Sequence, residues 1–287
     1  MKTEKKLLEN DYYLTGYIYV QDCNPNGDPD KDNMPRTDAI EGTGVMSDVS
    51  VKRAVRDYIL REYEGVEGYD ILEVEGTVKN SVIAEAKAKV GPKNPDDARS
   101  LLCDKYFDVR AFGSVLSTGP GGGCGRVYGP VQLGMVKSVD PIDITSCAIT
   151  TQTVANDTQV TNGNTDTMGR KYFTPFGLYR FTFSVNKQNA KKSGFTEQDY
   201  EVLKEAIAKM YNMRMSSSKG VMGIAKLWEV KINSNRSCTG TAHVHLGFKA
   251  TRKNTKVPAR QLSEYNFSIS DKLLKDDKIT ITELASL

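Results

Sequence analysis

The chain has 287 residues, of which 39% are hydrophobic and 26% charged, and its formal net charge is +3. These values indicate a soluble globular protein with either one large domain that carries insertions or a domain plus a small lobe. The apolar runs are too short for a transmembrane helix, and residues 1–11 lack the apolar core of a signal peptide. Five scattered cysteines without a CxxC pair favour neither a zinc knuckle nor a disulfide framework, so we expect reduced thiols in the cytoplasm.

The first regular element is a strand at residues 12–21. Leu14, Gly16, Ile18 and Val20 alternate with aromatic and polar residues, which is the period of a strand with two different faces.

A turn-rich loop, DCNPNGDPDKDNMPR, follows at residues 22–36. Its D-x-N-x-N-G start resembles a calcium loop, but the twelfth position is Asn33, where a bidentate Glu belongs. Prolines also interrupt it, and a strand precedes it in place of a helix. We therefore favour a rigid loop shaped by Asx turns, with calcium binding as the weaker alternative.

A helix is predicted to begin near Ser47, with Asp48 in its first turn. At 100° per residue, one stripe is apolar and the adjoining flank is basic. The stripe consists of Val51, Ala54, Val55, Tyr58 and Ile59, and the flank of Lys52, Arg53 and Arg56.

Residues 64–105 are polar and broken by glycine and proline, which indicates an insertion with a helix at 82–89. In the DVRAFG motif that follows, Arg110 and Phe112 would share a face if the segment were extended, a pair suited to stacking and phosphate contact. The alternative is a buried Phe beside a surface ion pair.

The glycine-rich residues 119–125 could approach phosphate or serve as a connector. Strand patterns return at 127–139 and 142–154.

Residues 145–167 are rich in threonine, lack basic residues and contain the turn signal NGN. They lead into MGRKYFTPFG, so we expect an extended hairpin with a basic and aromatic base. Arg170, Lys171, Tyr172 and Phe173 could insert beside a nucleobase. A further strand is predicted at 178–185.

A second helix is predicted after Thr196, because Thr196 and Asp199 have capping-box spacing and Phe195 and Tyr200 occupy the staple positions. Strands are expected at 225–232, 241–249 and 279–282. His243 and His245, the only two histidines, would share a face of the 241–249 strand. Five basic residues without an acid lie between Phe248 and Arg260, either a solvated loop or a nucleic-acid patch.

The order of elements predicts an α+β fold with a ferredoxin-like βαββαβ unit, which is the architecture of RNA-recognition modules.

Several long motifs occur in an order typical of one family. NPNGDPDKDNMPRTD, GTGVMSDVSVKRAVRDYI, DVRAFGSVLSTG, GPVQLGMVKSVDPIDITSCAITTQTV and MGRKYFTPFGLYRFTF carry this resemblance. The chain resembles the Cascade backbone subunit of subtype I-C CRISPR systems, Cas family seven of the repeat-associated mysterious protein (RAMP) superfamily. The resemblance is weakest at residues 64–105 and beyond 250.

The resemblance implies a non-catalytic protein that binds CRISPR RNA (crRNA), without cofactor or metal. It implies an RRM-like palm, a finger insertion at about 64–105 and a thumb hairpin at about 148–176, with residues 152–173 as the thumb itself. Copies would stack head to tail along the guide and present it to a target DNA strand. Implied partners are further copies and the Cascade subunits of Cas families five, eight (large subunit) and eleven (small subunit), and no membrane is implied.

The resemblance also implies a set of RNA-binding residues. They are Asn24, Asn26, Arg36, Lys52, Arg53, Arg56, Arg110, Phe112, Gln152, Met168, Arg170, Lys171, Tyr172 and Phe173. Met168, Tyr172 and Phe173 are the candidates for displacing a base. An RNA-processing endonuclease of the same superfamily is the main alternative, which the two histidines disfavour.

Overall fold

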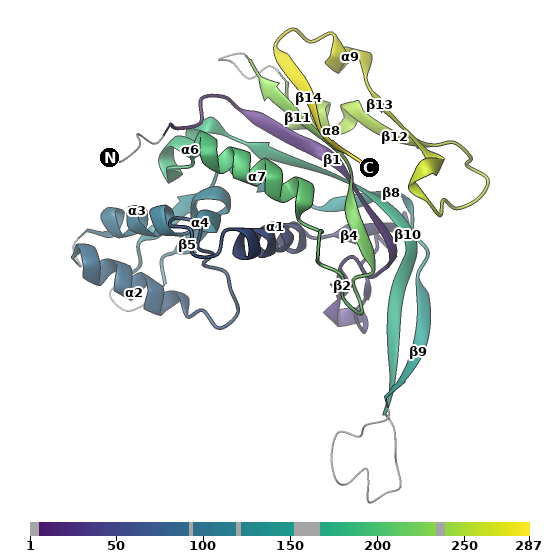
Figure 1. Ribbon diagram of the computed structural model, residues 1–287, viewed down its shortest axis with the longest axis horizontal. Helices are drawn as coiled ribbons and strands as arrows, with labels where there is room; N and C mark the ends of the chain where they lie inside the picture. The colour runs from purple at the N-terminus through teal and green to yellow at the C-terminus, as the bar shows by residue number, and fades with distance from the viewer. Residues whose placement is uncertain (1–5, 92–93, 119–121, 152–166, 234–238) are drawn as a thin grey trace, which may run out of the picture.

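The computed structural model describes residues 6–91, 94–118, 122–151, 167–233 and 239–287. Its centre is a large antiparallel sheet (Figure 1). Along the sheet the order is β14 (Ile279–Ser286), β11 (Val221–Ile232), β1 (Tyr12–Cys23), β10 (Thr167–Val185), β8 (Val136–Pro141) and β4 (Thr43–Met46). Two further strands, β7 (Val131–Leu133) and β9 (Thr145–Thr151), pair with β10. In the described part of the chain, no helix is long and apolar enough to cross a bilayer.

Helices pack on one face of this sheet. They are α1 (Asp48–Glu62), α6 (Lys187–Ser193) and α7 (Glu197–Lys209) (Figure 1). The predicted stripe of α1 is buried against β1 residues such as Leu14 and Ile18. Ser47 is the N-cap of α1, and Thr196 and Asp199 form a capping box on α7, so both predicted helix starts are confirmed.

A C-terminal lobe covers the other face. It contains α8 (Thr241–Gly247), β12 (Phe248–Arg252), η2 (Leu262–Glu264), β13 (Tyr265–Ile269) and α9 (Asp271–Leu274). Tyr17 and Trp228 of the sheet pack there with Phe248 and Tyr265. Because both faces are covered, the sheet is not an open platform like that of a simple RNA-recognition module.

The strand predicted at 241–249 is wrong in its first part, because residues 241–247 form α8. The alternation of small or apolar residues with His243 and His245 imitated a strand. In the lobe, Val244 and Gly247 are buried at helical spacing, and a Cβ on Gly247 would collide with Leu273. Packing therefore decided the conformation.

A second lobe lies to one side of the sheet (Figure 1). It is built from α2 (Lys79–Val90), α3 (Pro95–Lys105), α4 (Phe107–Phe112), β5 (Gly113–Leu116) and β6 (Gly125–Tyr128). The helix predicted at 82–89 lies within α2. The lobe has its own core, in which Ile83 and Leu102 share a cluster with Val127, so this core continues beyond the predicted 64–105 insertion.

The predicted hairpin is formed by β9 and the first part of β10, with Tyr172 opposite Ser146. It leaves the sheet and projects well beyond it (Figure 1). The strand predicted at 178–185 is not a separate element, because β10 runs without a break from Thr167 to Val185. The hairpin is thus an extension of a central strand. Gln152 lies outside the described residues.

Candidate nucleic-acid interface

The loop after β1 has a tightly bonded backbone. Asn24 donates its side-chain amide to the Asn33 carbonyl at 2.6 Å. The Asn26 side chain accepts the backbone N–H of Ser47 at 2.9 Å, which ties the loop to the start of α1. Asp32 and Asn33 adopt left-handed conformations, with φ of 50° and 58°, that Asp and Asn tolerate better than most residues. Among these contacts the expected Asx turn occurs at Asp28, whose side chain accepts the N–H of Asp30 at 3.4 Å, while the Asn24 and Asn26 side chains make longer-range bonds.

Short elements complete this loop: β2 (Gly27–Asp28), η1 (Pro29–Lys31) and β3 (Met34–Pro35). Arg36 lies 3.4 Å from Asp28 and remains about one-third exposed, so it can still face a ligand. Asn24 is buried and acts within the loop. Across the described ranges, no group of three or more His, Cys, Asp or Glu side chains is arranged to hold a metal ion.

The sequence analysis missed a segment between α7 and β11 that forms hydrogen bonds with this loop. The link between α7 and β11 bonds to it through Asn24 N–H, which donates to the Ser218 carbonyl at 2.9 Å. Lys219 donates to the carbonyls of Asn24 and Pro25 at 3.0 and 2.5 Å. Desolvation lowers the pKa of Lys219. The run of three serines before Lys219 was the available sequence signal.

The base of the hairpin reaches the same loop. Tyr172 donates its hydroxyl to Asp32 at 3.3 Å, so residues 140 positions apart in the chain meet here. Arg170 is exposed, while Lys171 and Phe173 are partly exposed. Met168 lies in β10 opposite Thr150. The structure therefore brings the predicted loop and the predicted hairpin base together into one surface, which we call the loop–hairpin surface (residues 24–36 and 169–173).

The basic flank of α1 is largely engaged within the protein. Lys52 pairs with Asp48 at 3.1 Å and Arg53 with Asp57 at 2.6 Å. Arg56, only 11% exposed, pairs at 2.8 Å with the buried Asp108. Of these three cations, Arg53 is the most exposed, at 40%.

Arg110 and Phe112 do not form the expected nucleic-acid surface. The DVRAFG segment is helical, as α4, and every residue from Phe107 to Phe112 is buried. Arg110 is bound to Asp199, and Phe112 lies beneath Arg56 at 5.0 Å from its guanidinium. The expectation of an extended, exposed pair was wrong because the carboxylate partner of Arg110 lies far away in the sequence.

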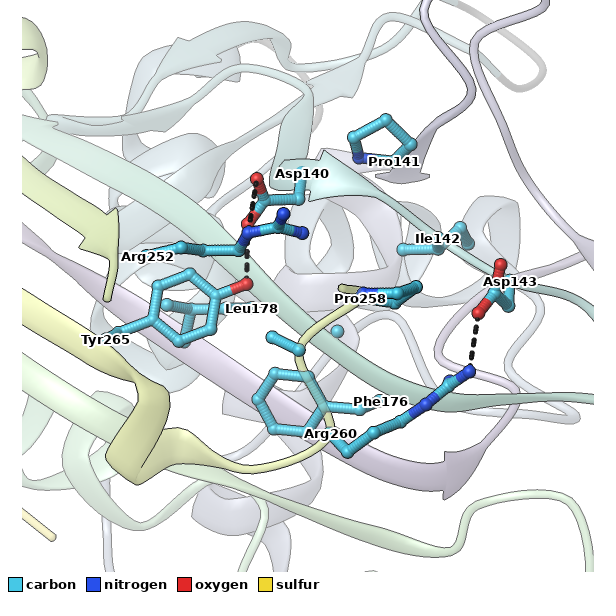
Figure 2. A pocket seen from close by; sticks show the side chains of 12 residues that line it. Asp140, Pro141, Ile142, Asp143, Phe176, Leu178, Arg252, Pro258, Arg260 and Tyr265 are labelled. Carbon is cyan, nitrogen blue, oxygen red and sulfur yellow. Dashed lines mark hydrogen bonds and ion pairs between the residues drawn. The ribbon is translucent and has the colours of Figure 1, made fainter. Parts of the chain in front are cut away.

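The basic cluster at 249–260 divides into two groups. Arg252 and Arg260 lie over the root of the hairpin, where Arg260 bonds to Asp143 at 2.8 Å and Arg252 lies 3.8 Å from Asp140 (Figure 2). Tyr265 also donates to Asp140, at 2.5 Å. These contacts attach the C-terminal lobe to the end of β8. Lys249, Lys253 and Lys256 are exposed.

The histidines lie on α8 and differ in environment. His243 is exposed. His245 is partly buried, with Nδ1 2.9 Å from the Thr182 hydroxyl, and desolvation with the nearby charge of Arg180 lowers its pKa to about 4. His245 is therefore neutral near neutral pH.

Comparison with known proteins adds an independent line of observation. A curated CRISPR-associated protein Cas7 of Haloferax volcanii is 36% identical over 110 residues, which is 35% of this chain and 31% of that protein. The match thus spans about a third of the relative's length. A chain of a CRISPR RNA-guided surveillance complex, pre-nicking, has a TM-score of 0.52 at 13% identity, covering 85% of this chain and 84% of that one. Another, from a CRISPR RNA-guided surveillance complex, has a TM-score of 0.47 at 14% identity, with coverage of 85% and 78%.

The solved structures, at these identities, are similar in fold alone. The family is shown by the sequence, because the model described as CRISPR-associated protein Cas7 matches residues 10–270. That range includes the loop, α1, the hairpin and most of the C-terminal lobe. The chain therefore belongs to the CRISPR-associated protein Cas7 family.

Proposed function

We propose that this chain is the crRNA-binding backbone subunit of a type I-C Cascade complex, and that several copies assemble along one guide RNA in the cytoplasm. The observation that carries the proposal is the loop–hairpin surface in a member of this family. There, the exposed Arg170 and the partly exposed Lys171 and Tyr172 stand beside a loop whose backbone is held rigidly. Cations with aromatic side chains suit the backbone and bases of a single strand.

The strand order supports a ferredoxin-like palm. In β11-β1-β10-β8, the two central strands are the first and third of a βαββαβ unit, with α1 after the first and α7 after the third. On this reading the hairpin is the thumb and the lobe of α2 and α3 is the finger. A hairpin that extends beyond its own sheet is suited to reach a neighbouring copy (Figure 1).

Binding through the RNA backbone would leave guide bases free to pair with a target DNA strand, as in other RNA-guided systems. We propose no catalytic role for this chain. Its two histidines are an exposed His243, whose Nε2 lies 3.3 Å from the Lys272 ammonium, and a partly buried His245. Incubation of purified protein with repeat RNA tests this point, and cleavage would favour the endonuclease alternative.

The main test is co-expression of the chain with a CRISPR array, followed by size-exclusion chromatography and RNA analysis. We expect an assembly of several copies with RNA of uniform length. Adding the Cascade subunits of Cas families five, eight and eleven should give a larger particle that binds DNA complementary to the guide. A monomer free of RNA in the first experiment contradicts the proposal.

A further inference from the structure

A groove of about 690 Å³ lies between the sheet and the C-terminal lobe, and its lining contains no residue of the loop–hairpin surface. Arg180 of β10 lines it on the sheet side, and His245, Lys249 and Thr251 line it on the lobe side. Its size is within the usual range of ligand sites.

Two of the three lysines and arginines that line this groove, Arg180 and Lys249, are available for a ligand, whereas Lys137 pairs with Asp38 at 2.9 Å and Glu41 at 3.5 Å. Arg180 lies beside the hydroxyl of Tyr17, and among the described residues neither Arg180 nor Lys249 takes part in an ion pair with an acid. The one acid in the lining, Glu41, already accepts from Lys137 at 3.5 Å and from Thr43 at 3.3 Å. The groove therefore has an excess of positive charge.

The positive charge continues beyond the groove. Lys249 and Thr251 lie two residues apart on one face of β12. Lys253 follows the end of this strand, and its N–H donates to the Glu264 carbonyl at 2.8 Å. The exposed Lys249 and Lys253 therefore follow one another along β12 and just beyond its end. Lys256 extends the exposed basic stretch, while Arg252 and Arg260 are held by Asp140 and Asp143.

We propose that this basic row (Arg180, Lys249, Lys253 and Lys256) binds the phosphate backbone of a second nucleic-acid strand, separate from the guide. Tyr17, the one Phe, Tyr or Trp side chain of the lining, is only 1% exposed and cannot stack on a base. Recognition is therefore electrostatic and independent of sequence. The site goes beyond the proposed function, because guide binding does not require it.

The test uses the full-length protein assembled on its guide. Fluorescence anisotropy measures binding of labelled 30-nucleotide DNA and RNA strands that are not complementary to the guide, across a range of salt concentrations. The test variant is Lys249→Glu/Lys253→Glu/Lys256→Glu. The matched control is Lys272→Glu/Lys275→Glu/Lys278→Glu, which changes three exposed lysines of the same lobe. Arg180→Gln is a milder second variant.

We expect the test variant to bind the added strand at least ten times more weakly, with a salt slope smaller by about 2, which corresponds to three lost phosphate contacts on a single strand. The control should stay within about twofold. Comparison of the two labelled strands shows whether DNA or RNA binds this site more tightly. Guide content, measured on the same samples, should be equal in all variants.

Three results would overturn the proposal. Equal weakening by the control would mean that only net charge matters. Loss of guide RNA from the test variant would mean that the row belongs to the guide site. Failure of the wild type to retain any guide is a different result, because it would contradict the proposed function itself. The third result is a test variant that binds the strands as the wild type does but no longer binds a glutamate-rich peptide that the wild type binds. That result would assign the groove to an acidic protein.

Discussion

The guanidinium of Arg110 forms a two-point ion pair with Asp199 in the interior, through Nη2 to Oδ1 at 2.6 Å and Nε to Oδ2 at 3.1 Å. The same Oδ2 accepts the backbone N–H of Thr196 at 2.9 Å, at the start of α7. One carboxylate thus caps α7 and attaches it to α4. Both side chains are less than 10% exposed.

Replacing Arg110 should therefore destabilise the fold. Arg110→Met leaves the carboxylate of Asp199 buried without its cation, which costs about 3–5 kcal/mol of unfolding free energy. Urea denaturation measures the loss. Arg126→Met, at an exposed position on β6, is the control and should change stability by less than about 0.5 kcal/mol. Normal stability with impaired RNA binding in Arg110→Met would restore the role expected from sequence.

Two cations on the basic flank of α1 should respond differently to replacement, because Arg56 is held in a structural ion pair whereas Arg53 is partly exposed. Arg56→Glu places a carboxylate against Asp108, which also accepts the N–H groups of Leu72 and Glu73. We predict a loss of at least about 3 kcal/mol, measured by urea denaturation. Arg53→Gln should cost less than about 1 kcal/mol, because its ion pair is partly exposed.

Arg53→Gln therefore tests whether α1 contacts the RNA, because the fold should tolerate this change. If α1 faces guide phosphates, the salt slope of RNA assembly should fall by about 0.7, the value for one contact on a single strand. A slope equal to that of the wild type would remove α1 from the RNA surface.

Charge reversal at the hairpin base should weaken guide assembly. Arg170→Glu/Lys171→Glu removes two cations from the loop–hairpin surface, so we expect less copurified RNA and a salt slope smaller by about 1.4. Lys191→Glu/Lys192→Glu on α6 makes the same charge change at two exposed lysines away from the hairpin (Figure 1). Similar losses in both variants would argue against a hairpin-specific contact.

Stability should fall in mild acid because of His245. Its pKa is about 4 in the folded protein, below the ordinary value of 6.5, so the unfolded chain binds the proton more readily between these values. The contribution of neutral His245 to the free energy of unfolding is complete above about pH 6.5. It is lost as the pH falls towards 4, by at most about 3 kcal/mol. Urea denaturation at several pH values measures it.

The two histidines provide the control for this experiment. His245→Asn keeps a polar group near Thr182 but does not titrate, so its stability should depend less on pH than that of the wild type. His243→Asn, at an exposed site, should behave like the wild type. Arg180→Gln should raise the pKa of His245 because it removes a nearby positive charge. Parallel pH curves for wild type and His245→Asn would contradict this account.

The sequence by itself determined the elements whose causes are local. The apolar stripe of α1, its Ser47 cap and the capping box of α7 depend on residues within one or two helical turns. The hairpin and the turn-rich loop were visible for the same reason, through alternation and turn residues. Their meeting at Tyr172 and Asp32 depends on a contact across 140 positions, which no local pattern encodes.

Tertiary structure alone decided which basic residues face solvent. Arg56 and Arg110 looked like RNA ligands, but their carboxylate partners lie 52 and 89 positions away, and only folding brings them together. The support of Asn24 by Lys219 and the helical state of residues 241–247 were equally hidden. In each case burial selects the arrangement, because a charge or a backbone polar group removed from water must find a partner wherever the fold provides one.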